Sequence, residues 1–205
     1  MAESESLQDV LSLSVRDFLA ATAATQPTPG GGSVAAVVGC LAAALGQMAL
    51  GYTRGRKAFA QHAQFHDALA RRLQRVRAMF EDLVGDDIQA YQLCVEAREI
   101  KPGPEKEQAT QIALAAAIDV PKELAKLCLA VLADLVEFSD KCNPRLMSDL
   151  KAAAALAAAV VRLSWYNVEA NVADLDDSQA AGDLRQGSKA DLEKAVLMLG
   201  KIENA

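Results

Sequence analysis

The sequence LARRLQRVRAMFEDLVGDD, residues 69–87, carries the pattern that decides the fold. Its apolar residues recur at alternating intervals of four and three positions, at Leu69, Leu73, Val76, Phe80 and Leu83. This spacing puts them on one face of an α-helix, and it is typical of the seam along which the helices of a bundle pack. We therefore predict a long helix from about residue 59 to residue 97.

The rest of the chain predicts further helices and no sheet. A content of 52% hydrophobic and 23% charged residues excludes an intrinsically disordered protein. Aromatic residues make up only 4%, and alanine, the best helix former, is abundant, which favours close-packed helices over a β-sandwich. Additional helices are expected to begin near residues 14, 33, 105, 143 and 177.

Local signals refine these helices. Ser14 and Asn143 are expected N-caps, with Pro144 in the first helical position. The segment 33–50 is apolar nearly all round, so neighbours should surround it, whereas Pro121 should kink or split its own helix. The sequence shows no repeat and no low-complexity linker. We therefore expect one domain over residues 1–205, an all-α bundle of long antiparallel helices.

The charge and the cysteine content limit the kinds of molecule and metal that the protein is expected to bind. The net charge of −6 argues against binding to nucleic acid or anionic lipid. The basic cluster that follows Leu69 is therefore predicted to form a solvated helix face, and it consists of Arg71, Arg72, Arg75 and Arg77. The four cysteines form no CxxC pair, which argues against zinc and indicates buried thiols in a reducing cytosol. The N-terminus has no basic region typical of a signal peptide, and residues 34–50 fit a core helix better than a membrane span. We expect a cytoplasmic protein.

Two aspartates fall on apolar stripes. The count along residues 69–83 continues to Asp87, and Asp149 opens a similar stripe that ends at Asn167. An ionised aspartate is rarely buried without a partner. Asp87 is therefore expected at a polar cavity or paired across an interface, a buried structural aspartate being the other interpretation.

The second stripe cannot form one compact site within a subunit. Asp149 and Asn167 lie 18 residues apart, which is about 27 Å of helix. Asn167 and Asn171 are therefore interpreted as interhelical hydrogen bonders or interface residues rather than catalytic residues.

The segment PTPGGGS, residues 27–33, places three glycines directly before the apolar helix. Glycine lets a ligand approach the backbone, and a helix N-terminus offers unpaired N–H groups with a partial positive charge. The turn therefore predicts an anion cradle, or only a tight turn and cap. It is neither a phosphate loop nor a dinucleotide fingerprint, which require other spacings or a preceding strand. The basic loop at Arg54, Arg56 and Lys57 favours an anionic ligand.

Six short motifs carry a resemblance to a known family. In order they are PTPGGGSVAA, GRKAF, DDIQAY, DVP, NPRLMSD and NVEAN. Together they resemble the formiminotransferase-cyclodeaminase C-terminal family, which includes stand-alone methenyltetrahydrofolate cyclohydrolases. The similarity runs from about residue 14 to residue 200, and its first and fifth motifs are the specific ones. The resemblance implies an all-helical fold, a homodimer, and a folate bound beside the glycine turn without metal or redox cofactor.

The resemblance also implies site residues. Asp149 is the first candidate for the catalytic base and Asp87 the second, with Ser148 or Asn143 orienting water or the pterin. The implied substrate-binding residues are Pro29, Gly30, Gly31, Gly32, Ser33, Lys57 and Asn143. The sequence departs from the family at two positions. It has Cys142 where the family often has glycine, and Phe59 where the family often has tyrosine.

The implied reaction is hydrolysis of 5,10-methenyltetrahydrofolate to 10-formyltetrahydrofolate. A buried carboxylate could stabilise the cationic substrate and take a proton from the attacking water. The first alternative is formiminotetrahydrofolate cyclodeaminase, which releases ammonia and usually accompanies a fused transferase domain. A second alternative is a non-catalytic helical scaffold for oligomerisation. The aspartates on the apolar stripes argue against a scaffold, because they would only weaken it.

Overall fold

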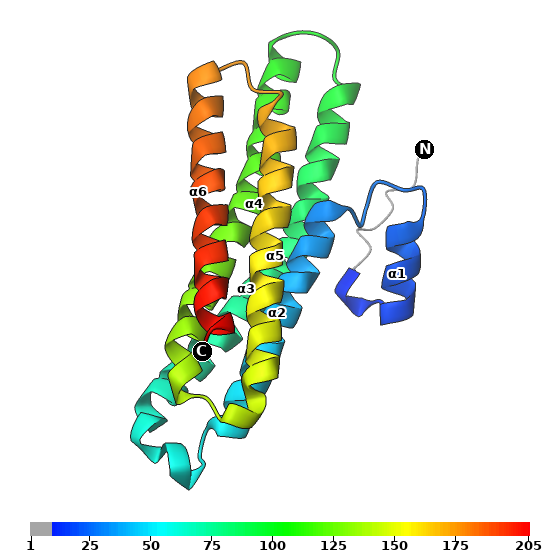
Figure 1. Ribbon diagram of the computed structural model, residues 1–205. Helices are drawn as coiled ribbons and strands as arrows, with labels where there is room; N and C mark the ends of the chain where they lie inside the picture. Colours follow the sequence, from blue (N-terminus) through cyan, green and yellow to red (C-terminus); the bar gives the residue numbers. More distant parts are fainter. Residues whose placement is uncertain (1–9) are drawn as a thin grey trace.

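The computed structural model describes residues 10–205 as a bundle of long helices (Figure 1). Successive long helices run antiparallel, and no strand occurs in this part of the chain. The six α-helices are α1 (Val15–Ala23), α2 (Gly31–Thr53), α3 (Ala63–Glu99), α4 (Pro104–Phe138), α5 (Met147–Val172) and α6 (Ser178–Glu203). The predicted all-α bundle is confirmed. The expectation that no signal peptide is present falls largely on residues 1–9, which lie outside the described residues.

Four short 3-10 helices lie between or before the long ones: η1 (Val10–Ser12), η2 (Lys57–His62), η3 (Ser139–Lys141) and η4 (Pro144–Leu146). Both predicted N-caps are present. Ser14 accepts a hydrogen bond from the backbone N–H of Asp17, and Asn143 accepts one from that of Arg145. Asn143 caps η4, however, so α5 begins only at Met147.

The predicted seam forms the core. Leu69, Leu73 and Phe80 are fully buried, and Val76 and Leu83 nearly so. They face α2, whose buried side consists mostly of glycine and alanine. Small residues let the helix backbones approach closely, which explains why an alanine-rich chain packs this way.

The expectation that neighbours surround α2 is only half met. One side of α2 packs against α3, α4 and α5, but Leu41 and Tyr52 on the other side are 54% and 55% exposed. Periodicity could not reveal this, because an apolar helix surface predicts burial without saying which chain provides the cover. By length and composition α2 is also the one described helix that could cross a membrane. The inner side of α2, however, is buried against the other helices of the bundle, as it is in a core helix.

Pro121 does not split its helix. Helix α4 runs continuously from Pro104 to Phe138 with Pro121 buried inside it. A proline lacks the N–H that would bind the carbonyl four residues earlier, here Ala117. The Ala117 carbonyl instead accepts a hydrogen bond of 2.7 Å from Nδ2 of Asn171 on α5. The neighbouring helix thus replaces the missing bond, so of the two predicted outcomes, a kink or a split, the split is wrong.

The close packing of α2 against α3 can be tested at Gly39. A Cβ atom there would lie 2.9 Å from Cδ1 of Phe80, a ring with no exposed surface that cannot easily yield. We predict that Gly39→Ala lowers the free energy of unfolding by about 1–3 kcal/mol, measured by urea denaturation.

Gly51 is the matched control in the same helix. It is exposed, and a Cβ atom there would meet no atom within 4 Å. Gly51→Ala should therefore raise the free energy of unfolding by about 0.4–1 kcal/mol. Equal effects of the two substitutions would show that the Phe80 contact does not constrain α2.

Candidate functional site

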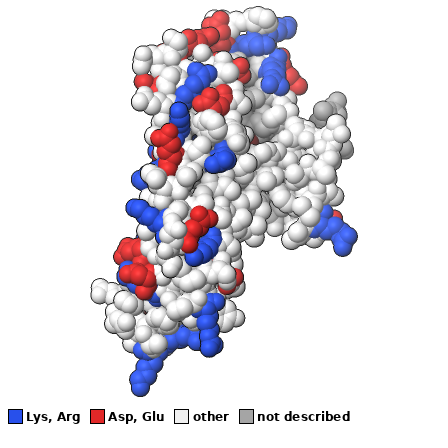
Figure 2. All heavy atoms as spheres, in the orientation of Figure 1, with Lys and Arg blue, Asp and Glu red and all other residues white. Residues whose placement is uncertain are grey.

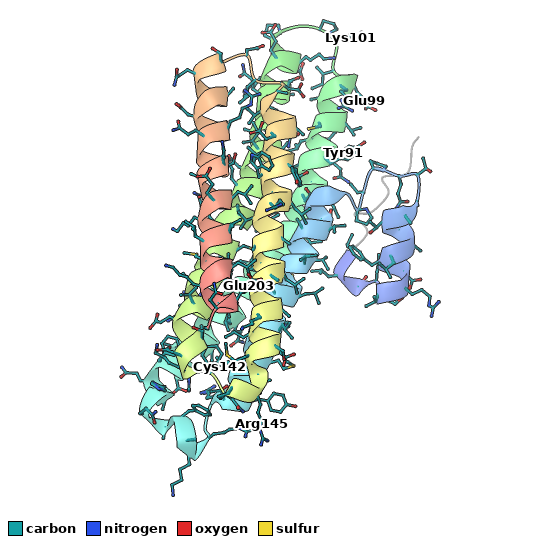
Figure 3. The ribbon with its side chains drawn as sticks, viewed as in Figure 1. Tyr91, Glu99, Lys101, Cys142, Arg145 and Glu203 are labelled. Carbon is teal, nitrogen blue, oxygen red and sulfur yellow. The ribbon has the colours of Figure 1, made fainter. Side chains whose placement is uncertain are left out.

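A cleft of about 270 Å³ opens where the glycine turn and the start of α2 meet α3, α4 and α5. Figure 3 shows Tyr91 on α3 close to the start of α2, at this level of the bundle. Four of the predicted site residues line the cleft: Gly30, Gly31, Gly32 and Asp87. Pro29 and Ser33 lie beside them in the same turn and are buried.

Asp87 is held against the first turn of α2. The Ser33 hydroxyl donates a hydrogen bond of 2.6 Å to Oδ2 of Asp87. The other carboxylate oxygen, Oδ1, lies so close to Gly32 that a Cβ atom at that position would overlap it. Glycine is therefore required at position 32 because a carboxylate from another helix occupies the space of a side chain. The expectation that Asp87 lies at a polar cavity is confirmed.

The start of α2 also supplies hydrogen-bond donors. Gly30 precedes the helix in an extended conformation, and no side chain caps it. The first N–H groups of a helix have no intrahelical acceptor, and the helix dipole gives this end a partial positive charge. The cleft therefore combines the carboxylate of Asp87 with the N-terminal end of α2, which no side chain caps. Such a pair can bind a group that carries both a positive centre and hydrogen-bond acceptors.

Two asparagines form the wall on α5. Asn171 donates to the Ala117 carbonyl, as expected for an interhelical hydrogen bond. Asn167 lies next to Gly31, since a Cβ atom there would be 3.5 Å from Oδ1 of Asn167. Its amide faces the glycine turn in the cleft. Sequence reasoning had interpreted Asn167 as structural, so it missed this place in the site.

Tyr91 and Arg98 on α3 also line the cleft and were not predicted. They follow Asp87 by 4 and 11 residues, which returns each to the same helix face. The seam itself does not find them, because its count continues from Asp87 to Ala90 and Cys94, which also line the cleft. Among the described residues that line this cleft, Arg98 is the one basic residue. Its guanidinium group provides a positive charge further along α3 from Asp87.

The remaining predicted residues lie at the opposite end of α2. The backbone N–H of Asn143 donates a hydrogen bond of 3.0 Å to Oγ1 of Thr53, the last residue of α2. Ser148 and Asp149 follow in the first turn of α5, and Lys57 is exposed just after α2. Figure 3 shows Cys142 and Arg145 at this end, far from Tyr91.

Within one chain the predicted site is therefore divided. From Gly31 to Thr53, α2 spans 22 residue steps, which is about 33 Å. The structure brings Asp87 to the glycine turn and does not bring Asp149 there. The roles of Ser148, Asp149, Asn143 and Lys57 stay predictions.

Three of the four thiols are poorly suited to act as nucleophiles. Burial raises the pKa of Cys40 to about 11, and it also raises the pKa values of Cys128 and Cys142. A thiol with a raised pKa stays protonated and unreactive near neutral pH. Between residues 10 and 205, no cluster of three or more His, Cys, Asp or Glu side chains is arranged to hold a metal ion.

The chain is similar to known proteins of one family. The family described as formiminotransferase-cyclodeaminase matches residues 14–190. The methenyltetrahydrofolate cyclohydrolase of Methylorubrum extorquens is 31% identical over 169 residues, which cover 80% of this chain and 81% of that protein. The formimidoyltransferase-cyclodeaminase of Mus musculus is 33% identical over 212 residues, which cover 96% of this chain but 38% of that protein. The crystal structure of formiminotetrahydrofolate cyclodeaminase from Thermotoga maritima has a TM-score of 0.84 at 26% identity, covering 94% of this chain and 96% of that one.

The contact between Gly32 and Asp87 can be tested by a double-mutant cycle. We predict that Gly32→Ala lowers the free energy of unfolding by about 1–3 kcal/mol, because the new Cβ atom displaces the carboxylate. In an Asp87→Ala background the same change should lose most of this effect, as measured by urea denaturation. Gly31→Ala is the control, since its Cβ atom would make ordinary contact at 3.5 Å from Asn167. An undiminished effect in the Asp87→Ala background would contradict the steric explanation.

Proposed function

Because the chain belongs to the formiminotransferase-cyclodeaminase family, we propose that it is an enzyme that hydrolyses 5,10-methenyltetrahydrofolate to 10-formyltetrahydrofolate. Its similarity to the Methylorubrum extorquens cyclohydrolase extends over most of both proteins. The observation that carries the proposal is the Asp87 carboxylate, held by Ser33 at the start of α2 and facing a cleft. A carboxylate in that position suits a cationic substrate that must react with water.

The proposed reaction uses Asp87 as the base. The substrate carries a delocalised positive charge over N5, N10 and the carbon that bridges them, and a nearby carboxylate stabilises it. Asp87 takes a proton from water as the water oxygen bonds to the bridging carbon. Protonated Asp87 returns this proton to N5 as the bond from the carbon to N5 breaks, and the hydroxyl group loses its own proton to become the formyl oxygen on N10. One proton is released overall. The bridging carbon is already electrophilic, so we propose no metal or redox cofactor.

Other cleft residues fit the rest of a folate. Arg98 is suited to pair with a glutamate carboxylate of the substrate, because guanidinium groups bind carboxylates well. Tyr91 can pack against an aromatic ring, and the Asn167 amide can hydrogen-bond the pterin. Asp87, the second candidate from the sequence, thus becomes the first, because it shares a cleft with the glycine turn.

The cyclodeaminase reaction is the second candidate. The Thermotoga maritima structure and the mouse relative bear that name. The same residues could serve it, since N10 would attack the formimino carbon and ammonia would leave. Assaying purified protein with methenyl and formimino substrates side by side distinguishes the two activities.

We further propose that the protein is a homodimer that pairs through α2. The outer side of α2 carries large apolar residues at intervals of four and three, at Val34, Val38, Leu41, Leu45, Met48 and Tyr52. This spacing is that of a helix-pairing seam. In Figure 2 the surface over α2 is almost free of charged side chains, whereas charges gather over α6 and at the ends of the bundle. A second copy of the same face is the occupant that matches it best.

A two-fold axis through the middle of this seam would pair the two α2 helices in antiparallel fashion. The glycine turn of one subunit would then lie near the C-terminal end of the partner's α2. That end carries Lys57, Asn143, Ser148 and Asp149, which are remote from the turn within one chain. The proposed partners are therefore a folate and a second copy of this chain, in the cytoplasm.

The role of Asp87 can be tested in the methenyl hydrolysis assay. We predict that Asp87→Asn lowers kcat/KM by about 100-fold or more, because the amide cannot accept the proton. The measurement follows the loss of the methenyl chromophore, with equal unfolding curves as the check on folding. Full activity of Asp87→Asn would rule out the proposed base.

The same assay tests the contribution of the second subunit. If Asp149 of the partner subunit completes the site, Asp149→Asn alone is also impaired. Mixed dimers of Asp87→Asn and Asp149→Asn chains should then recover activity, because one of their two sites is wholly native. Recovery would be absent if both aspartates acted within one subunit or if Asp149 had no role.

The dimer itself is tested by a charge placed in the seam. We predict that Leu41→Glu shifts the protein from dimer to monomer in sedimentation experiments and lowers its activity, since a buried unpaired carboxylate disfavours association. Leu197→Glu on α6, at a residue that is 69% exposed, is the control and should leave the dimer intact. An unchanged sedimentation coefficient for Leu41→Glu would exclude pairing through this face.

A further inference from the structure

Pro121 lies in the wall of the cleft beside the glycine turn, and Ala117, four residues before it, has a carbonyl that lacks its backbone partner. We infer that Pro121 is a positioning residue, and that through Asn171 it makes the cleft selective for a ring that carries an amino group. The inference rests on the proposed folate substrate, whose pterin ring carries an amino group at position 2. It holds for either of the two candidate reactions, because both act on a folate.

The hydrogen bond from Asn171 to Ala117 fixes the orientation of the amide. A carbonyl oxygen can only accept, so the atom that lies 2.7 Å from it is the Nδ2 donor of Asn171. The other end of the amide, Oδ1, is an acceptor, and no residue between 10 and 205 donates a hydrogen bond to it. Asn171 therefore holds a free acceptor that cannot exchange places with its donor.

This acceptor is open to a ligand. Asn171 is half-buried and lines the cleft. Within the described part of the chain, the side-chain atoms that are both fully buried and unpaired belong to His66, Ser164 and Trp165, and none belongs to Asn171. A donor on a molecule in the cleft can therefore reach Oδ1.

Asn167, one turn earlier on α5, has no such fixed amide. It lines the same cleft, but its side chain makes no hydrogen bond with any residue from 10 to 205. It can therefore turn either its oxygen or its nitrogen toward a ligand. Selectivity for a donor needs an amide that cannot turn, since a free amide accepts from one ligand and donates to another. Asn171 meets this condition because the Ala117 carbonyl holds its nitrogen.

The position of Asn171 suits the far edge of a pterin. The reacting carbon would lie at Asp87 and the start of α2, beside which Asn167 also lies. Asn171 follows Asn167 by four residues, which is about 6 Å further along α5. The 2-amino group of a pterin lies on the edge of the ring away from the N5–N10 bridge. With the bridge at Asp87, this amino group would donate to Oδ1 of Asn171.

Isothermal titration calorimetry with 5-formyltetrahydrofolate and its 2-desamino-2-methyl analogue tests the inference. The analogue keeps the shape of the ring but replaces the amino donor by a methyl group. We expect the wild-type protein to bind the amino compound about three- to tenfold more tightly, the difference that one hydrogen bond makes. Asn171→Leu should remove most of this preference.

Pro121→Ala should reduce the preference, because its new backbone N–H competes with Asn171 for the Ala117 carbonyl. Pro104→Ala is the matched control in the same helix. Pro104 is the first residue of α4, where an N–H group has no intrahelical acceptor, so its replacement should leave the preference unchanged.

A double variant separates ligand recognition from stability. Asn171→Leu leaves the Ala117 carbonyl without a partner and should lower the urea concentration at which the protein unfolds. Adding Pro121→Ala gives that carbonyl a backbone donor, so the double variant should regain stability but not the preference for the amino compound. A preference that persists in Asn171→Leu, or returns in the double variant, would overturn the inference alone. Failure of both compounds to bind the wild-type protein would reject the folate ligand, and with it the proposed function as well as the inference.

Discussion

The approach of the Asp87 carboxylate to the bare backbone of Gly32 is the constraint on which the site depends. Any side chain at position 32 would occupy the place of Oδ1, so α2 and α3 could not meet in this way. The Ser33 hydroxyl then fixes the carboxylate by a single short hydrogen bond. One aspartate is thereby held at the N-terminal end of a helix, where it faces a cleft. The glycine turn thus leaves room for a side chain of α3 as well as for a ligand.

The wall of the cleft formed by α4 and α5 depends on a hydrogen bond that replaces a missing backbone one. Pro121 removes one backbone donor from α4, and Asn171 of α5 supplies a replacement to the Ala117 carbonyl. The exchange ties α4 to α5 just where Asn167 reaches the glycine turn. A proline that would ordinarily weaken a helix therefore positions a polar side chain. The same two helices continue past the cleft and pack against α6.

The sequence predicted which face of each helix is buried better than it predicted which residues of different helices meet. The apolar spacing from Leu69 to Leu83 identified the buried face of α3, and its continuation identified Asp87 as a polar interruption. Periodicity reports the face of one helix but not which helix it meets, so the contact of Asp87 with Gly32 could not be predicted. The position of Asn167 beside Gly31 could not be predicted for the same reason. The split predicted at Pro121 does not occur, because the compensating donor comes from Asn171, 50 residues further along the chain.

The two faces of α2 bear on why four of the ten predicted site residues lie far from the other six. Gly32, Gly39 and Gly46 recur every seven residues on its inner side, where the helices of the same chain pack closely. The larger residues on the outer side, such as Leu41 and Tyr52, follow an equally regular spacing but find no cover in one chain. A helix with two apolar faces needs two sets of neighbours, because water would otherwise contact one of them. If the second set is the partner's α2 in antiparallel orientation, both ends of the helix meet at each site, and a short chain builds its cleft from two subunits.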